Sequence, residues 1–244
     1  SQIRELPKLD IKDYLYLNDL INNFDIKDAK RVKTIEKKTN HDVKAIEYFI
    51  REKFKKHKKL SKYQEFIHFA CTSEDINNLS YALMIKEAKS ITKAAINETN
   101  KKIKQLANKY KKISMLSRTH GQSASPTTMG KEFANFHHRI NKISLSVERR
   151  TMTGKINGAV GNYNAHRVAY PEIDWQKISN QFVRSLKLDF NSHTTQIEPK
   201  DTIALLLGDY VKLNNVFIDM SRDIWGYISL GYFKQKLKKG EVGS

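Results

Sequence analysis

Apolar residues recur at helical spacing over three long stretches of this chain, close to every 3.5 residues in the first and at alternating steps of three and four in the other two. This periodicity restricts the fold more than any other feature. Such spacing places successive side chains on one face of a helix. The first stretch, residues 76–113, is about ten helical turns long. The apolar positions of the three stretches are, in order, Leu79, Leu83, Ile91, Ala95, Ile103, Leu106 and Tyr110; Phe133, Phe136, Ile140, Ile143 and Val147; and Ile203, Leu206, Tyr210, Leu213, Phe217, Met220, Ile224 and Tyr227. Long helices of this kind bury their apolar faces best against one another.

Residues typical of helix ends stand near these stretches. We expect Ser125 to be the N-cap of the second helix and Pro126 its first residue, because a Ser side chain caps free N–H groups and Pro has none to cap. The third helix is expected over about 200–234, with Pro199 at its beginning. A shorter amphipathic helix is expected between the second and third, behind Asp174 as its N-cap.

The remaining sequence completes the predicted architecture. Residues before about position 70 predict shorter, Lys-rich helices, and no segment shows a convincing period of two. We therefore predict an all-α fold. Residues 1–70 form a smaller helical N-terminal domain that is incomplete at its start. Residues 71–244 form a central domain, a bundle of long helices, which is also incomplete and ends in a loop.

Charge and composition narrow the function classes. The chain has 44 Lys and Arg against 26 Asp and Glu, a net charge of +18, which suits nucleic acid, an acidic membrane surface or small anions. Only 10 of the basic residues are Arg, the side chain favoured for bidentate phosphate and base contacts. We therefore prefer a compositional bias toward Lys to nucleic-acid binding. The single cysteine, Cys71, excludes an internal disulfide, and with no apolar run of about 18 residues and no leader we expect a soluble cytoplasmic protein.

Where the apolar stretches stop, the connecting sequences are rich in Thr, Ser, Asn, Gln, His and Gly. Short neutral donors of these types enclose an anion without carrying a strong field of their own. A bundle brings several connections together at its ends, so these are the candidate functional segments. They are "KTNHDVKA" (38–45), "CTSEDINN" (71–78), "SRTHGQSASP" (117–126), "GKINGAVGNYNAH" (154–166) and "SHTTQIEP" (192–199).

Histidine is the side chain best suited to proton transfer near neutral pH. For His120 we favour a functional role, because Gly121 follows it directly and hydroxyl and amide side chains flank it. His41 and His68 stand within or beside two of the other polar segments. Structural roles are expected for the remaining histidines, which are His57, His137, His138, His166 and His193.

Other site chemistries lack their patterns. The sequence has no HExxH or CxxC spacing, and the adjacent His137 and His138 point to different faces of a helix, so we expect no metal. A GxSxG nucleophile elbow is absent as well. The segment "NGAVGN" lacks the GK[ST] ending of a phosphate loop. A turn that passes close to a ligand or another chain is the better interpretation of that segment.

Several segments in their order along the chain resemble the adenylosuccinate lyases, a family of the fumarase and aspartase superfamily. The resemblance covers about residues 30–244. It implies that the protein needs no cofactor or metal. It implies β-elimination of fumarate from adenylosuccinate to give AMP, and from SAICAR to give AICAR, by general acid and base catalysis. The matching strings are "TNHDVKAIEYF", "EFIHFACTSEDINNLSYAL", "LSRTHGQSASPTTMGKE", "GKINGAVGNYNAH", "YPEIDW", "TTQIEP", "RDIWGYI" and "GEVGS".

The resemblance also implies roles for individual residues. His120 is the implied general acid, and the residues assigned to substrate binding are Asn40, His41, Asp42, His68, Thr72, Ser73, Thr119, Gln196 and Ser244. Thr72 and Ser73 would hold the succinyl carboxylate, and Gln196 would bind substrate. Residues 40–42 would line the site near the nucleotide, and His68 would support substrate binding.

The family's base is the second serine of a "GSS" signature loop, and Ser244 matches the first. We therefore expect that the sequence is part of a longer polypeptide and that residues beyond Ser244 complete the site. The resemblance further implies a homotetramer in which three chains contribute to each site. A mass of 28.3 kDa for the natural protein would contradict the expectation of further residues.

Two alternatives stay open. Another fumarate-releasing lyase, of the argininosuccinate lyase or fumarase type, would share the "TS" and "TH" elements but not "TNHDVKA" or "KINGAVGNYNAH". A basic helical nucleic-acid-binding protein would explain the charge but not the uncharged segments. Salt-sensitive binding to random duplex DNA would favour that last alternative.

Overall fold

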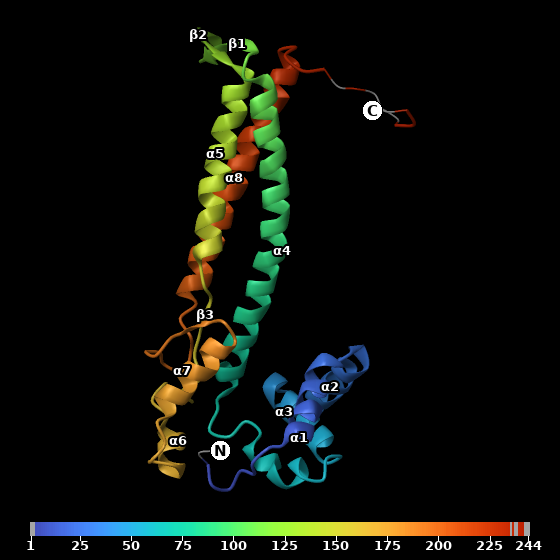
Figure 1. Cartoon of the computed structure of the whole chain (residues 1–244), viewed down its shortest axis with the longest axis vertical. Coiled ribbons are helices and arrows are strands. Elements are labelled where there is room, and N and C mark those ends of the chain that lie inside the picture. The colour runs from blue at the N-terminus through green and yellow to red at the C-terminus, as the bar shows by residue number, and fades with distance from the viewer. Residues whose placement is uncertain (1–2, 235, 237–238, 242–244) are drawn as a thin grey trace. The chain divides into compact units, whose positions relative to one another are not determined.

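Helix α4 runs without interruption from Ser73 to Tyr110 in the computed structural model (Figure 1), which describes residues 3–234, 236 and 239–241. The fold is mostly helical, as predicted, and also contains two small two-stranded sheets. The other helices are α1 (Ile11–Asn22), α2 (Ile26–Thr39), α3 (Asp42–Phe54), the 3₁₀ helix η1 (Leu60–Phe66), α5 (Met129–Arg149), α6 (Asn164–Ala169), α7 (Trp175–Ser185) and α8 (Asp201–Ser229). The strands are β1 (Ser114–Thr119), β2 (Gln122–Thr128), β3 (Thr153–Gly154) and β4 (Asp189–Phe190).

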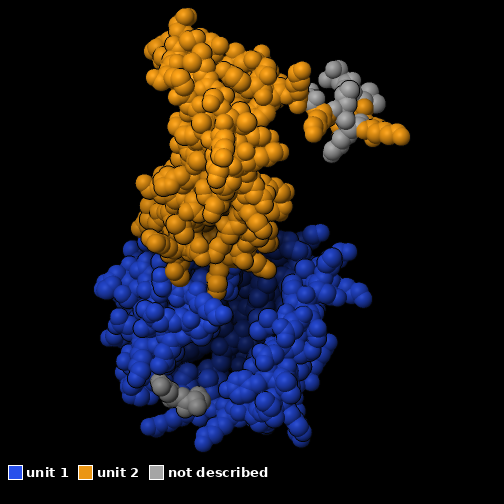
Figure 2. Space-filling model, turned by 45° about the horizontal axis from the view of Figure 1, so that its top comes forward, with its two compact units in different colours: residues 1–84, 152–199 blue, residues 85–151, 200–244 orange. Residues whose placement is uncertain are grey.

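The chain divides into two compact units, coloured separately in Figure 2. Unit 1 comprises residues 1–84 and 152–199, and unit 2 comprises residues 85–151 and 200–244. Helix α4 contributes its first turns to unit 1 and the rest to unit 2. These units are not the two predicted domains, 1–70 and 71–244. The predicted boundary between domains at residue 70 stays a prediction.

Unit 2 is a bundle in which α4, α5 and α8 lie side by side (Figure 1). The predicted positions of α5 and α8 and the last three of α4 pack in or against its core, except Val147, Ile203 and Leu206, since a stripe at helical spacing has one face to bury. The prediction was wrong for Leu83, Ile91 and Ala95, which are exposed, and Ile96 is the buried residue of that part of α4. Ile140 of α5 has no exposed surface. The buried core consists of Ile96, Ile103, Met115, Met129, Phe133, Phe136, Ile140, Leu213 and Val216. Burial of each large apolar side chain contributes about 1.5–3 kcal/mol to stability.

The predicted start of the second long helix was wrong. Ser125 and Pro126 lie in strand β2, which pairs with β1 in an antiparallel hairpin, and α5 begins only at Met129. Its N-cap is Thr128, whose hydroxyl accepts a hydrogen bond from the backbone N–H of Lys131 at 3.1 Å. The hairpin escaped prediction because both strands are mostly exposed, with Met115 the buried position of β1, so no apolar alternation marks them.

The third predicted helix, α8, is confirmed with a shorter span. It ends at Ser229 rather than about residue 234. Pro199 lies outside it, because Lys200 adopts a left-handed backbone (φ 65°) at the N-cap position and the helix begins at Asp201. The first long helix begins at Ser73 and ends at Tyr110, three residues earlier at each end than predicted.

Unit 1 holds the shorter helices expected before residue 70. Helices α2 and α3 pack together over a small core that contains Val32, Ile35, Ala45 and Phe49. The N-cap prediction for α7 is confirmed, because the Asp174 carboxylate accepts from the backbone N–H of Lys177 at 3.0 Å. Strands β3 and β4 pair in parallel through two residues each. None of the helices in the described ranges is long and apolar enough to cross a membrane.

Candidate functional site

The turn between α2 and α3 positions the first predicted group, Asn40, His41 and Asp42. Asn40 closes α2 in a left-handed conformation (φ 52°), which Asn tolerates better than most residues. His41 is the N-cap of α3, and its Nδ1 accepts from the backbone N–H of Lys44 at 3.3 Å. Asp42 opens the helix, and the hydrogen bond from the backbone N–H of Val43 lowers the pKa of its carboxyl. His41 and Asp42 are exposed, so both are available to a ligand.

The second group, Thr72 and Ser73, lies at the N-terminus of α4. The first backbone N–H groups of a helix have no partner inside it, and the helix dipole places partial positive charge there. An anion is therefore favoured beside these two residues. Both side chains are half-buried. The backbone N–H of Thr72 donates to the carboxylate of Asp75 at 2.9 Å, which fixes the start of the helix.

Three contacts bring the groups of unit 1 together. Ser73 Oγ and His41 Nε2 lie 3.3 Å apart. The amide of Gln196, on the segment between β4 and α8, donates to Thr72 Oγ1 at 3.4 Å. Asp42 accepts from the amide of Asn77, one turn into α4, at 3.3 Å. Five residues predicted from distant parts of the sequence thus form one cluster of mostly neutral donors.

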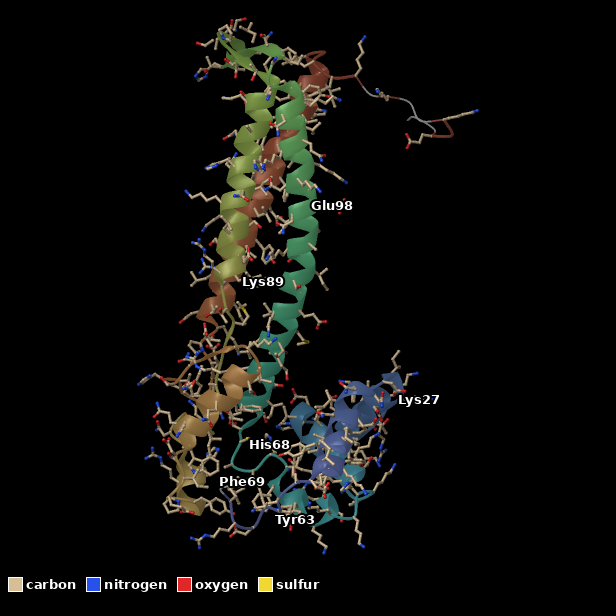
Figure 3. The ribbon with its side chains drawn as sticks, in the orientation of Figure 1. Lys27, Tyr63, His68, Phe69, Lys89 and Glu98 are labelled. Carbon is tan, nitrogen blue, oxygen red and sulfur yellow. The ribbon has the colours of Figure 1, made fainter. Side chains whose placement is uncertain are left out.

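His68 lies in the segment between η1 and α4, next to Phe69 (Figure 3). Its backbone is left-handed (φ 63°). Burial lowers the pKa of its imidazole, while the charge of Glu47 acts in the opposite direction. Near neutral pH the ring is therefore neutral and serves as a hydrogen-bonding group. Burial also raises the pKa of the nearby Cys71 thiol to about 12, so this cysteine is unreactive.

Thr119 and His120 belong to unit 2, at the tip of the β1–β2 hairpin. Thr119 pairs with Gln122, which leaves His120 and Gly121 as a two-residue loop. Both have positive φ, 51° and 74°, the combination found in type I′ turns. This turn accounts for the Gly after the histidine. The side chains of Thr119 and His120 are exposed. Ser244 lies outside the described residues.

Sequence reasoning missed three residues beside the unit 1 cluster: Asn77, Asp75 and Lys155. A signal for Asp75 was present, since Thr72 and Asp75 have the spacing of a helix capping box. Lys155 had no local signal, because its partner is Asp75, 80 residues earlier in the chain. A sequence pattern of short range does not contain such a pair.

The predicted structural role of His137 is supported, since its Nδ1 lies 2.9 Å from Asn100 Oδ1. Across the described residues, no group of three or more His, Cys, Asp or Glu side chains is arranged to hold a metal ion. Instead, the side chains of the unit 1 cluster are of the kind that binds a carboxylate group. It combines hydroxyl and amide donors with a helix N-terminus.

Comparisons with known proteins show the family to which the chain belongs. The family model described as Lyase matches residues 8–244. The chain is 52% identical over 243 residues to adenylosuccinate lyase of Legionella pneumophila (strain Corby), which covers 99% of this chain and 53% of the relative. It is 50% identical to adenylosuccinate lyase of Escherichia coli (strain K12), covering 100% and 54%. The chain thus spans about half the length of the curated relatives that it matches.

Solved structures give the same fold at much lower identity. A fumarate lyase from Mesorhizobium sp. BNC1 matches with a TM-score of 0.75 at 16% identity, over 90% of this chain and 50% of its own. The β-carboxy-cis,cis-muconate cycloisomerase of Acinetobacter calcoaceticus sp. ADP1 matches with a TM-score of 0.72 at 18% identity, over 88% and 48%. The structural likeness supports the fold, and the match of residues 8–244 shows that the chain belongs to the Lyase family.

Proposed function

We propose that the whole protein carrying this chain is an adenylosuccinate lyase. It eliminates fumarate from adenylosuccinate to give AMP and from SAICAR to give AICAR. Identity of 50–52% to adenylosuccinate lyases along 99–100% of the chain supports this activity over an argininosuccinate lyase or fumarase type. The structural observation that carries the proposal is the cluster of His41, Thr72, Ser73 and Gln196 at the start of α4.

The chemistry of elimination explains why this cluster is neutral. A base removes a proton from the carbon next to a carboxylate, the C–N bond breaks, a C=C bond forms and an acid protonates the departing nitrogen. Negative charge spreads onto the carboxylate as the proton leaves. Thr72 and Ser73 hold that carboxylate, Gln196 adds an amide donor, and the N-terminus of α4 favours the growing charge. His41, Asn40 and Asp42 contact the nucleotide, and neutral His68 supports binding.

His120 is the proposed acid, with Thr119 beside it. The type I′ turn leaves the imidazole exposed at the tip of the hairpin, where it is free to approach a substrate. Along the chain, the 38 residues of α4 separate the Thr72 cluster from this hairpin. Sites assembled from more than one copy of the chain are therefore part of the proposal. The proposed base is a serine that follows Ser244. Ser244 itself contributes to substrate binding.

An unpartnered face of α8 supports a homotetramer. One face of this helix packs in the bundle core. A second row of apolar side chains lies exposed at steps of four, seven, seven and three, namely Leu207, Val211, Ile218, Trp225 and Ile228. Trp225 is 73% exposed. Helices with such rows associate side by side, so this row is the proposed contact between copies of the chain.

The proposal includes no cofactor, no metal, no nucleic acid and no membrane, and it places the enzyme in the cytoplasm. The test is to incubate the whole protein with adenylosuccinate and follow the change in purine absorbance as AMP forms. Wild type should release fumarate. The His120→Ala variant should lose about 100- to 10,000-fold in kcat, the usual contribution of a general acid, while His137→Ala should retain activity.

Two outcomes would contradict the proposal. A well-folded wild type that does not convert adenylosuccinate would refute the activity, and undiminished turnover by His120→Ala would refute the assigned acid. Tight, salt-dependent binding to random duplex DNA by an inactive protein would favour the nucleic-acid alternative.

A further inference from the structure

Asp75 and Lys155 form an ion pair with no exposed surface on either side chain, Nζ to Oδ1 at 2.9 Å. Moving two charges out of water is costly, and their mutual attraction often fails to offset that cost. The attraction between the two charges is therefore a weak explanation for the pair, and the groups that it holds in place are a better one.

The Asp75 carboxylate holds two segments that are far apart in the sequence. It accepts from the backbone N–H of Thr72 at 2.9 Å. It also accepts from the backbone N–H groups of Asn157 and Gly158, both at 3.1 Å. Lys155 completes the arrangement, since its Nζ donates to the carbonyl of Gly158 at 3.1 Å. Asp75 thus joins the start of α4 to the segment after β3.

The connections continue to the segment that carries Gln196. The Asn157 amide, fully buried, donates to Thr194 Oγ1 at 2.8 Å. Gly161 lies against the same residue so closely that an added Cβ would be 2.1 Å from the carbonyl oxygen of Thr194. Two residues further on, Gln196 donates back to Thr72 at 3.4 Å. The contacts close a ring that begins and ends at Thr72.

We propose that Asp75 and Lys155 are positioning residues for the elimination, an inference that rests on the proposed function. Their ion pair holds Thr72 and Gln196 at the spacing that grips the succinyl carboxylate. Neither residue touches substrate. Asp75 acts through the backbone of Thr72 and through Asn157, and Lys155 acts by pairing with the Asp75 carboxylate and keeping it oriented.

Only a carboxylate meets the requirements at position 75. Its two oxygens accept from three backbone N–H groups and from one ammonium group. An Asn side chain has one acceptor oxygen, and its NH₂ would face a backbone N–H, leaving donors opposed. Lys155 is needed because an ionised carboxylate without a partner is strongly disfavoured in a buried site.

The test compares Asp75→Asn with the double variant Asp75→Asn/Lys155→Met in the whole protein. The single change leaves Lys155 buried and unpaired, so it should lower the melting temperature strongly. The double change removes both charges at similar volume and should recover the part of that loss that comes from the unpaired charge. Activity should not recover with it. We expect kcat/KM for adenylosuccinate to stay about 100-fold below wild type, a loss typical of misplaced groups, with kcat carrying most of it.

Asp209→Asn is the matched control. Asp209 is 2% exposed and pairs with Arg150 within unit 2, and neither residue is among the proposed site residues. This variant should lower the melting temperature while kcat/KM of the folded enzyme stays within twofold of wild type. Such a result separates a loss of positioning from a loss of stability.

Each result of this comparison bears on the inference. An active wild type with a double variant that regains both stability and activity would show that the pair is only structural, and the inference alone would fail. An inactive wild type would overturn the proposed function and this inference with it. Stability regained without activity, beside an active wild type and an active Asp209→Asn enzyme, is the supporting result.

Discussion

The two compact units bury very different side chains. Unit 2 is held by aliphatic and aromatic residues from three helices, such as Phe136 and Ile140. Unit 1 buries polar and charged groups where its loops meet, among them Asp75, Lys155 and Asn157. Apolar packing tolerates small errors of position, whereas a buried polar group needs a partner at hydrogen-bond distance. Under the proposed function, the bundle is a frame and the polar contacts of unit 1 hold the groups that bind substrate.

The largest effect that tests this contrast is expected from Ile140→Ala in the bundle. Ile140 has no exposed surface and lies within the core of α4, α5 and α8. Removing its buried methyl and methylene groups should lower the free energy of unfolding by about 2–5 kcal/mol. Denaturant titration measures the change. KM for adenylosuccinate should stay the same, and a large change in KM would contradict the view of the bundle as a frame.

Gly161→Ala in unit 1 should have the opposite effect, a smaller loss of stability together with a clear change in KM. Gly161 has a φ of 83°, and an added Cβ would collide with the backbone of Thr194. The strain should cost about 1–3 kcal/mol and should displace the segment that holds Gln196, so KM for adenylosuccinate should rise clearly. Steady-state kinetics beside a thermal melt give both quantities. An unchanged KM would contradict the close packing of these two segments.

A matched glycine on α8 provides the control for that change. Gly226 has no neighbouring atom within 4 Å of the position of an added Cβ. Gly226→Ala should stabilise the helix by about 0.5–1 kcal/mol, because alanine has less conformational freedom to lose on folding. Its kinetic constants should equal those of wild type.

A smaller effect is expected at the beginning of α5. Thr128→Ala removes the hydroxyl that accepts from the backbone N–H of Lys131 and should cost about 1 kcal/mol. The matched Thr128→Ser variant keeps the cap and should lose little. Denaturant titration compares the two. Equal losses in both variants would mean that the methyl group of Thr128, rather than its cap, stabilises the helix.

The smallest expected difference comes from pH. Burial lowers the pKa of His68 and of His166, both in unit 1, so unfolding lets these imidazoles bind protons more readily. The two neutral imidazoles contribute to the stability of the fold above about pH 6.5, which is the pKa of histidine in an unfolded chain. This contribution to stability is lost as the pH falls through the lower pKa of the folded state. Hydrogen exchange at pH 7.5 and 5.5, corrected for intrinsic rates, should show α7 losing protection relative to α8. Equal losses in both helices would contradict this.

The contrast between the units also explains what the sequence predicted. A stripe such as that of α8 is readable because each apolar position reports its burial without reference to a partner. The cap at Asp174 was predicted for the same reason, since its signal is local. The hairpin was missed because its polar, exposed strands carry no such pattern. A local signal can also mislead, since Ser125 and Pro126 have the residue types of a helix start but lie in strand β2.

The candidate site was predictable in composition but not in arrangement. Resemblance and polar character pointed to Thr72, Ser73 and Gln196, and the contacts among these segments appear in unit 1. The pair of Asp75 and Lys155 was missed because an ion pair across 80 residues depends on the whole fold. A buried network is a property of several segments at once.

The turn that carries His120 can form early, while the rest of the chain is still being synthesised. Its strands are adjacent in sequence, and α8 ends roughly 100 residues after the hairpin. A hairpin forms in about 1–10 μs, whereas a ribosome adding about 5–20 residues per second needs several seconds for that length. The time before α8 emerges spans on the order of a million such formation times. The left-handed geometry at His120 is thus sampled during synthesis, long before the third helix of the bundle exists to hold it.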